Sequence, residues 1–248
     1  MSNETIRLLQ SHRSERDFTN EPVSDEILNA IVRAAQQSPT HRHGQQISLV
    51  VVRDAHTRQR LFEVTAGPQP QIARAPVFIL VAVDFHKTSV AVRHGGGEQH
   101  IHESLEGWTV GAVDAGITLA TLSTAARSFG LGAVAIGAIR HDPQPVIDLL
   151  GLPRWTFPIV GICIGYVVEP SEVKPRLPVS TYRHDERYDA QALTSQILEE
   201  YDRTLLAHWA AVGRKEGTSW TQRVQPYRTS VHPETRLVAE RQGFTLAE

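Results

Sequence analysis

This 248-residue chain contains a single cysteine, Cys163, and that scarcity limits its covalent and metal chemistry. One thiol cannot form an internal disulfide or a multi-cysteine metal site, and it fits a protein kept in a reducing cytoplasm. Cys163 lies in an apolar run, residues 158–164, so we expect a buried structural thiol. The chain also lacks a strong net charge, because its 25 basic and 27 acidic residues give a formal net charge of −2. We therefore expect no general attraction to nucleic acid or to an anionic membrane, and any basic cluster must act locally.

Long apolar stretches typical of exported and membrane-spanning chains are also missing. Residues 1–7 have no apolar signal core, which predicts a cytoplasmic protein. Residues 107–128 form a long apolar segment, but Asp114 and many Gly, Ser and Thr residues interrupt it. A membrane span more often has about 20 consecutive apolar residues. We interpret the segment as a helix buried on nearly all sides, either at the centre of the fold or between two subunits.

The pattern of apolar residues predicts an α+β or mixed α/β fold, with helices first and then strands alternating with helices. Ser24 is expected to cap a helix that ends near Gln37, because acids follow it in the first turn. Short runs rich in β-branched residues predict strands covered on both faces at 47–52 and 77–83. Further strands are expected near 134 and at 158–164. Further helices are expected at 107–128, 143–150, 190–211 and 233–242, and a mobile loop at 87–103.

No internal repeat and no Pro-, Gly- or Ser-rich linker divides the chain. One domain is therefore expected over residues 1–248. Its last part, from about residue 187 to 248, is polar and basic and is predicted to form a C-terminal helical extension. The extension is too long for a simple cap, so we expect it to wrap around a partner subunit.

Two short segments, His12–Arg16 and Lys174–Pro178, concentrate cations and hydrogen-bond donors. Together they offer three guanidinium groups, one ammonium and one hydroxyl, from Arg13, Arg16, Arg176, Lys174 and Ser14. This set suits a phosphate monoester, which carries nearly two negative charges and several acceptor oxygens. Proline in the second segment pins φ and keeps its basic side chains on a stiff extended backbone. For either segment alone, a solvated basic patch is the alternative.

A run of small residues, 130–140, contains three glycines and three alanines. Small residues let a backbone approach a flat ligand closely and offer N–H donors without side-chain bulk. The glycines follow a helix and enter a strand, so they do not form a dinucleotide-binding fingerprint. Taken in isolation, the run is explained better by a tight helix-to-strand turn, which accounts for both Gly130 and Gly132.

Four ordered blocks together make the chain resemble the nitroreductase superfamily, and more closely its NADPH-dependent, oxygen-insensitive nitroreductase and flavin reductase branch. They are His12–Phe18, Gly130–Gly137, Gly161–Gly165, and Lys174–Pro178 followed by His184 and Glu186. The resemblance covers residues from about 5 to 244. It implies an α+β, nitroreductase-like mixed sheet flanked by helices, in an intertwined homodimer that holds FMN at the subunit interface.

The resemblance also implies which residues bind the flavin. The phosphate, the ribityl chain and the pyrimidine edge would be held by His12, Arg13, Ser14, Arg16, Lys174 and Arg176. The backbone of Ile136, Gly137 and Ala138 would lie along the flavin and place an N–H near N5. Gln69 would contact the ring, and Thr40 would keep a hydroxyl at its face. Arg16 or Lys174 would stabilise the anionic reduced flavin, and no catalytic nucleophile or general base is expected.

The activity implied is a ping-pong reaction in which NADPH, the co-substrate, passes hydride through FMN to a small aromatic acceptor, a nitroaromatic or a quinone. Two alternatives stay open. One is a flavin reductase that releases reduced FMN to a partner enzyme, and the other is a flavin-binding protein without turnover. The natural acceptor does not follow from the resemblance, because one fold serves many acceptors.

Two segments depart from the pattern of the superfamily. His41, Arg42 and His43 stand where relatives have small or apolar residues, and we predict that they face the acceptor. An exposed polar loop is the alternative. His232 stands about where a superfamily arginine near the pocket would align, so it joins the predicted acceptor pocket.

In the C-terminal part, the resemblance implies that Arg214, Lys215 and Arg223 bind the 2′-phosphate of NADPH, because arginines near the C-terminal helix do so in relatives. Glu216 weakens the charge of this run. A histidine-rich segment, His94–His102, lacks a firm third ligand, so no metal site is expected there. Gating of the acceptor is the function we predict for that segment.

Overall fold

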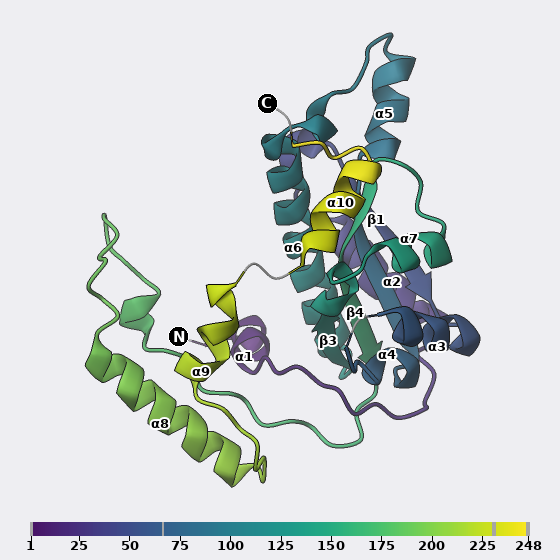
Figure 1. Cartoon of the computed structure of the whole chain (residues 1–248). Helices are drawn as coiled ribbons and strands as arrows, with labels where there is room; N and C mark the ends of the chain where they lie inside the picture. The colour runs from purple at the N-terminus through teal and green to yellow at the C-terminus, as the bar shows by residue number, and fades with distance from the viewer. Residues whose placement is uncertain (1, 66, 230–231, 247–248) are drawn as a thin grey trace. The chain divides into compact units, whose positions relative to one another are not determined.

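The computed structural model describes residues 2–65, 67–229 and 232–246. The chain divides into two compact units, of which the first comprises Met1–Ser171 and His232–Glu248, and the second comprises Glu172–Val231 (Figure 1). The second unit thus begins before the predicted extension at about residue 187, and the last helix of the chain belongs to the first unit.

The first unit is built on a sheet of four strands in the order β1-β2-β4-β3. Each neighbouring pair is antiparallel, and a bulge near Val81 interrupts the pairing of β2 with β4. The strands are β1 (Ile47–Val52), β2 (Val77–Asp84), β3 (Gly132–Ile136) and β4 (Thr156–Gly165). The four predicted strands and the α+β class are confirmed.

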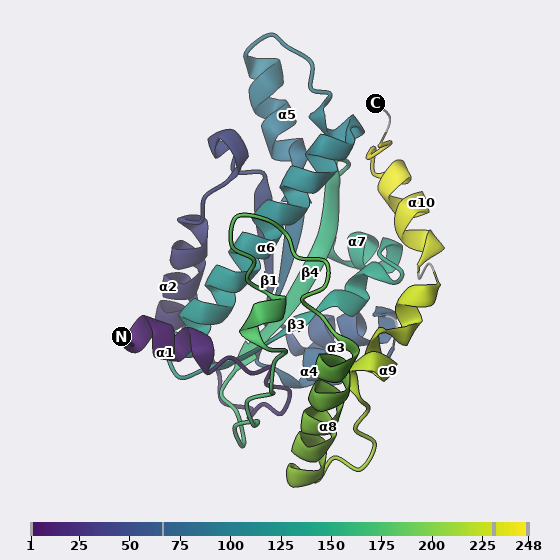
Figure 2. The same ribbon diagram turned by 90° about the vertical axis from the view of Figure 1, so that its left-hand side faces the viewer.

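Helices cover both faces of this sheet (Figure 2). Alternate side chains of β2 point to opposite faces, so Ile79 and Val81 pack on one side and Phe78 and Leu80 on the other. The first face lies under α2 (Asp25–Gln36) and α6 (Leu105–Ser128). The second lies under α3 (Ala55–Val64), α4 (Gln71–Arg74) and α7 (Gln144–Leu150). Ser24 caps α2 as predicted, because its side chain accepts a hydrogen bond from the N–H of Ile27.

The long helix α6 contacts all four strands, as the core helix of a folded domain does. By length and composition alone it would also pass as a membrane span, which is weak evidence. Buried residues recur along one side of α6, whereas Val113 on another side is 55% exposed. Within one chain, the prediction of a helix buried on nearly all sides is therefore wrong. Burial between two subunits stays a prediction.

The predicted loop at 87–103 is wrong, because most of it is helical. Asp84 caps α5 (Phe85–His94) by accepting from the N–H of Lys87, and η2 (Ile101–Glu103) follows. Only residues 95–100 connect them. The polar sequence hid this helix, since only Phe85 and Ser89 of α5 are buried.

Short elements complete the first unit. They are α1 (Glu4–Gln10), η1 (His41–His43), η3 (Gly137–Arg140) and α10 (Pro233–Arg241). The C-terminal segment packs on the rest of the first unit through Val238 and Phe244. The Phe244 ring lies 5.5 Å from that of Trp108.

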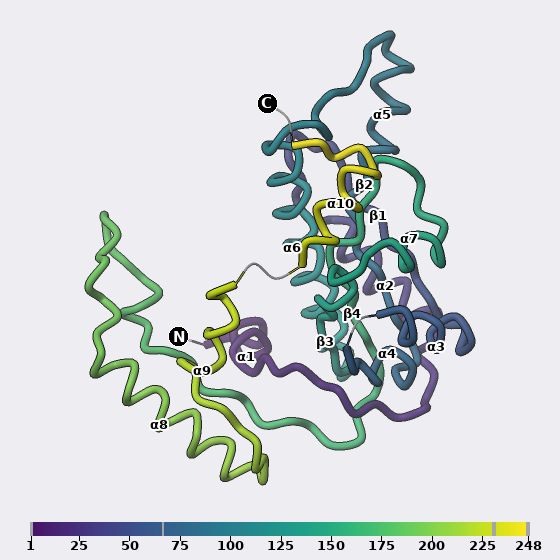
Figure 3. Tube along the Cα trace, in the orientation of Figure 1, coloured from purple at the N-terminus to yellow at the C-terminus, as the bar shows by residue number. Residues whose placement is uncertain are grey.

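The second unit contains η4 (Val179–Thr181), α8 (Ser195–Ala211), α9 (Trp220–Val224) and η5 (Gln225–Arg228). Its chain runs through a long irregular stretch before α8 begins (Figure 3). Thr194 caps α8 by accepting from the N–H of Ile197, so this helix begins five residues later than predicted.

Candidate functional site

Alternate residues of the segment after α1 line two different cavities of the first unit. His12 and Ser14 line a cavity of about 390 Å³, and Arg13 and Glu15 line a smaller one of about 170 Å³. Arg16 is exposed and donates a hydrogen bond to the backbone carbonyl of Ser14. The predicted phosphate-binding residues near the N-terminus are thus neighbours in space, but they do not all line one cavity.

The larger cavity has a wall of small residues. These come from α6 and from β3, and they are Gly116, Ala120, Ala133 and Ala135. A Cβ atom placed on Gly116 would meet nothing within 4 Å, so the wall opens on free space there. Ile136 and Ala138 are instead buried in the core on the opposite face of the sheet, and Gly137 is half-buried. A flat apolar wall beside a few polar groups suits a planar ligand.

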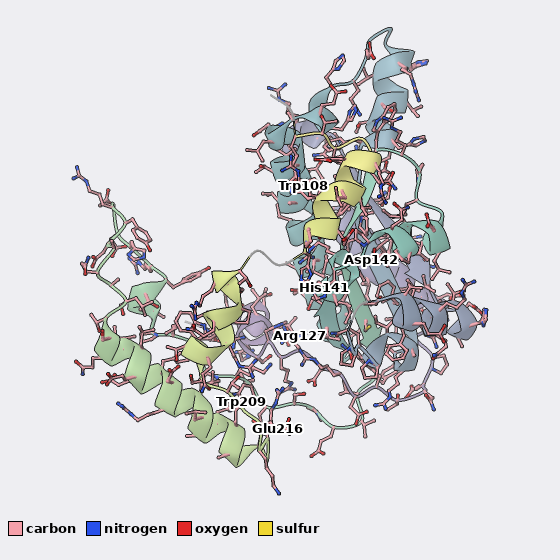
Figure 4. The ribbon with its side chains drawn as sticks, in the orientation of Figure 1. Trp108, Arg127, His141, Asp142, Trp209 and Glu216 are labelled. Carbon is pink, nitrogen blue, oxygen red and sulfur yellow. The ribbon has the colours of Figure 1, made fainter. Side chains whose placement is uncertain are left out.

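Arg127 is a polar residue of this region that the sequence did not point to. It lies in the last turn of α6 beside α1 (Figure 4), and its Nη2 donates to the carbonyl of Leu8 at 2.5 Å and to Ser11 Oγ at 2.8 Å. It lines both cavities. Burial, and then the charge of Arg13, lower the pKa of Arg127. In the sequence, Arg127 could have been noticed only as a single cation near the end of an apolar helix.

Glu15 was also missed, because the matched motif leaves its position free. Glu15 is only 4% exposed, and its carboxylate accepts from Arg13 Nε at 3.0 Å and from Ser171 Oγ at 2.6 Å. A Cβ atom on Gly132 would lie 2.3 Å from Val167 Cγ1 and 2.8 Å from Glu15 Cβ. Close approach to these two side chains therefore explains why residue 132 is glycine, whereas Gly130 has a φ of 76° and forms the turn.

The segment that carries three predicted acceptor residues has a strained backbone. Arg42, His43 and Gln45 have φ values of 50°, 56° and 51°, in the left-handed region that non-glycine residues rarely adopt. Arg42 and His43 are exposed, and the Thr40 hydroxyl accepts from the N–H of Gln45. A cavity of about 300 Å³ lies beside this segment and is lined in part by Thr40 and Gln45.

Asp114 of α6 holds this segment in place. Its carboxylate accepts from the backbone N–H of His41 at 3.1 Å and from Gln46 Nε2 at 2.6 Å. Asp114 is 3% exposed, and burial raises the pKa of its carboxyl group above the usual value. Asp114, the acid that interrupts this apolar helix, thus anchors a turn that is distant in the sequence.

His232 stacks on His141, which is not one of the other predicted acceptor residues. The two ring centroids lie 3.7 Å apart with planes at 18°. His141 follows η3, which carries Gly137 and Ala138, and Figure 4 shows it near the start of α10. Burial, and then the neighbouring His232, lower the pKa of His141. Gln69 is half-buried, and its side-chain oxygen accepts from Gln71.

The histidine-rich segment places its members in different surroundings. His100 is exposed and bonds to Glu103 at 3.0 Å. His102 is buried, with its ring 5.0 Å from that of Trp155, and burial lowers the pKa of His102. Among the residues that the structure describes, no group of three or more His, Cys, Asp or Glu side chains could hold a metal ion.

In the second unit, two of the predicted 2′-phosphate residues meet at one aromatic ring. The guanidinium carbons of Arg214 and Arg223 lie 5.0 Å and 5.1 Å from the ring centroid of Trp209. Lys174 Nζ lies 5.7 Å from the same ring. Lys215 is exposed, and Arg176 donates to the carbonyls of Lys174 and Pro175.

Known proteins resemble the chain along nearly its whole length. Residues 9–166 match the Nitroreductase family, and residues 174–247 match the Nitroreductase family, C-terminal domain. An FMN reductase (NAD(P)H) of Bacillus subtilis (strain 168) is 39% identical over 245 residues, which is 98% of each chain. An oxygen-insensitive NADPH nitroreductase of Salmonella typhimurium is 34% identical over 212 residues, 84% of each. The structure of NfrA2 from B. megaterium matches with a TM-score of 0.94 and 36% identity, covering 100% of both chains.

Proposed function

This chain belongs to the nitroreductase family and is an NAD(P)H-dependent flavin oxidoreductase, and from this premise we propose that it reduces nitroaromatic or quinone acceptors at the expense of NADPH. The observation that carries the proposal is the larger cavity of the first unit. Its wall of small residues, with His12 and Ser14 beside it, combines a flat apolar surface with hydrogen-bonding groups. FMN has the same two parts, a planar ring system and a phosphorylated polar chain.

The groups of the cavity fit FMN. Gly116, Ala120 and Ala135 would lie against the ring system, and His12, Ser14 and Arg127 would hold the polar chain. When bound, FMN would supply the redox chemistry that links NAD(P)H to the acceptor. The other predicted flavin contacts remain part of the proposal, namely Arg13, Arg16, Thr40, Gln69, Ile136, Gly137, Ala138, Lys174 and Arg176.

The acceptor is proposed to be a small aromatic molecule that reaches the exposed segment of His41, Arg42 and His43. The strained backbone there supports a functional role, because strain persists where surrounding contacts, such as those of Asp114, maintain it. His232, stacked on His141, is proposed to contribute on the side of η3. Neither group needs to act as a nucleophile.

We further propose a cytoplasmic homodimer whose two units per chain work as one functional domain, with FMN at the subunit interface. Exposed small and apolar residues of α6 support this assembly. Val113 is 55% exposed, and Gly116 and Ala120, which line the larger cavity, are exposed as well. A second subunit covering this side of α6 would complete the burial predicted for the helix and close the cavity.

Release of reduced FMN to a partner enzyme is a second candidate function, favoured by the name of the Bacillus subtilis relative, an FMN reductase. The two candidates differ in how tightly the flavin is retained. Gel filtration of the NADPH-reduced protein under anaerobic conditions separates them, because a flavin reductase loses its flavin to the small-molecule fraction and a nitroreductase keeps it.

The proposal is tested by the absorbance spectrum of the purified protein and by two matched variants. Ala120→Leu fills the larger cavity from α6, and Ala91→Leu adds the same atoms to the exposed face of α5. We expect wild type and Ala91→Leu to bind FMN and to be bleached by NADPH, and Ala120→Leu to lose flavin. Full flavin occupancy in Ala120→Leu, with unchanged bleaching, would place the FMN elsewhere.

A further inference from the structure

The indole of Trp209 is surrounded by cations from three separate segments of the second unit. Lys174 comes from the irregular stretch before α8, Arg214 from the turn after α8, and Arg223 from α9. All three charged groups lie within 6 Å of the ring centroid, the range of a cation–π contact. Trp209 itself is 5% exposed, although Arg214 and Arg223 are exposed.

The turn that carries Arg214 is built around this indole. Trp209 Nε1 donates to the carbonyl of Thr218 at 3.0 Å, and the N–H of Arg214 donates to the carbonyl of Trp209 at 2.8 Å. A Cβ atom on Gly217 would lie 2.3 Å from Trp209 Cβ, so only glycine lets the turn pack this closely. Figure 4 labels Trp209 on α8 and Glu216 in the turn that follows. The position of Arg214 therefore depends on the indole.

A second set of contacts fixes the helix that carries Arg223. Asp202 of α8 accepts from the N–H groups of Trp220 at 2.8 Å and Thr221 at 3.1 Å. Ser219 and Gln222 form a reciprocal capping box at the same end. Because α9 is only five residues long, these contacts at its start determine where Arg223 lies.

The guanidinium groups of Arg214 and Arg223 repel each other across the ring, and each is attracted to the ring only weakly. An arrangement of this kind is relieved by a doubly charged anion that contacts both guanidinium groups. A phosphate monoester carries nearly two negative charges, whereas a ribose hydroxyl carries none. The cluster therefore distinguishes a nucleotide with an additional phosphate monoester from one without it.

We propose that Trp209 is the specificity-determining residue for NADPH, because it gathers Arg214, Arg223 and Lys174 into one binding site for the 2′-phosphate. This inference rests on the proposed function and adds two residues to it. Trp209 positions the cations without touching the reacting atoms. Lys174 contributes its charge to the nucleotide site in addition to the flavin role proposed for it.

The test measures binding of 2′,5′-ADP and of 5′-AMP to the FMN-loaded protein by isothermal titration calorimetry. Wild type should bind 2′,5′-ADP more tightly. Trp209→Leu should weaken 2′,5′-ADP binding about tenfold, since three cation–π contacts are lost, and should leave 5′-AMP binding unchanged. Arg203→Ala, which removes an exposed arginine of α8 outside the cluster, should bind both ligands as wild type does. The ratio of kcat/KM for NADPH to that for NADH should fall with Trp209→Leu by a similar factor.

The outcomes separate the inference from the proposed function. Equal binding of the two ligands by wild type would overturn a 2′-phosphate site in this unit altogether. If wild type discriminates, and Arg214→Gln loses the discrimination while Trp209→Leu keeps it, the 2′-phosphate site stands and the role of Trp209 is overturned. If Trp209→Leu does not fold, Trp209→Phe tests the role of Trp209 instead, because it keeps an aromatic ring with weaker cation–π attraction. It is expected to lose about threefold in 2′,5′-ADP affinity, and wild-type affinity would overturn the inference.

Discussion

At the scale of single residues, Asp114 shows how a buried charge can be useful. Desolvation makes its ionised form costly, which is why burial raises the pKa of this carboxyl group. The cost is offset by hydrogen bonds from His41 and Gln46, which lie 73 and 68 residues earlier in the chain. The same acid thus interrupts an apolar helix and maintains the left-handed backbone of Arg42 and His43.

Asp114→Ala should destabilise the fold by roughly 2 kcal/mol, because the N–H of His41 and the amide of Gln46 would lose a buried acceptor. Relief of the buried charge keeps the loss from being larger. Urea denaturation measures it, with Glu63→Ala, which removes an exposed acid of α3, as the control. We also expect the KM for the acceptor to rise while the KM for NADPH is unchanged. Wild-type values for both would show that Asp114 does not hold the segment.

Acidification should destabilise the protein through His102, which is buried, and His141, which is half-buried. Burial lowers the pKa values of His102 and His141 below 6.5, so the unfolded chain binds more protons than the fold in this range. Their contribution to stability is complete above pH 6.5 and is lost as the pH falls through their lowered pKa values. Urea denaturation at pH 5 to 8 measures this dependence, which His102→Gln should make shallower.

Asp114 acts in the opposite direction on the same curve. Its raised pKa means that the fold binds a proton more readily than the unfolded chain, so ionisation of Asp114 lowers stability as the pH rises. Without this group, as in Asp114→Asn, stability should fall more steeply on acidification than in wild type. A shallower curve for Asp114→Asn would contradict this assignment.

At the scale of elements, Glu15 joins segments that are far apart in sequence. Its backbone N–H donates to the carbonyl of Ala133 on β3, and its carboxylate binds Ser171, 156 residues later. Glu15 also pairs with Arg13, and the charges of Arg13 and Glu15 act in opposite directions on the pKa of Arg127. One buried acid thus connects the N-terminal motif with β3 and with Ser171.

Glu15→Ala should lower stability by about 2–3 kcal/mol, since it leaves Arg13 without its partner and the N–H of Ser171 without its acceptor. Arg13→Ala in the same chain should recover part of this loss, and the double-mutant cycle measures the coupling. Glu21→Ala removes an exposed acid nearby and serves as the control. Simple additivity of the two substitutions would argue against a direct Arg13–Glu15 interaction.

At the scale of the whole molecule, the proposed dimer makes a quantitative prediction. Light scattering should give a mass of twice 27.5 kDa. Val113→Glu places a charge on the exposed side of α6, and we expect it to dissociate the dimer and to reduce flavin retention. Val90→Glu on α5, where the valine is 51% exposed, is the matched control and should remain dimeric. A dimer unaffected by Val113→Glu would place the interface on another surface.

Much of the fold was readable from local patterns. The strands at β1, β2 and β4 follow from short β-branched runs, and Ser24 marks the start of α2, because both signals act between residues close in sequence. Helix α5 escaped prediction since its sequence is polar and few of its residues are buried. The basic run that contains Arg214 is visible in the sequence, whereas the role of Arg214 and Arg223 at the 2′-phosphate came from the resemblance and stays a proposal.

The partners of the charged groups could not be read in this way. Glu15 with Ser171, Asp114 with His41 and His141 with His232 each join segments that the chain separates widely. Such pairs have no period or spacing in the sequence, because they arise only when helices and strands pack. Trp209 shows the same limit within one unit. The sequence contains the three cations, but only folding brings them to the same ring. The sequence alone thus shows the residue types that suit a flavin and a phosphate. Which side chains each of these residues contacts is decided only by long-range packing.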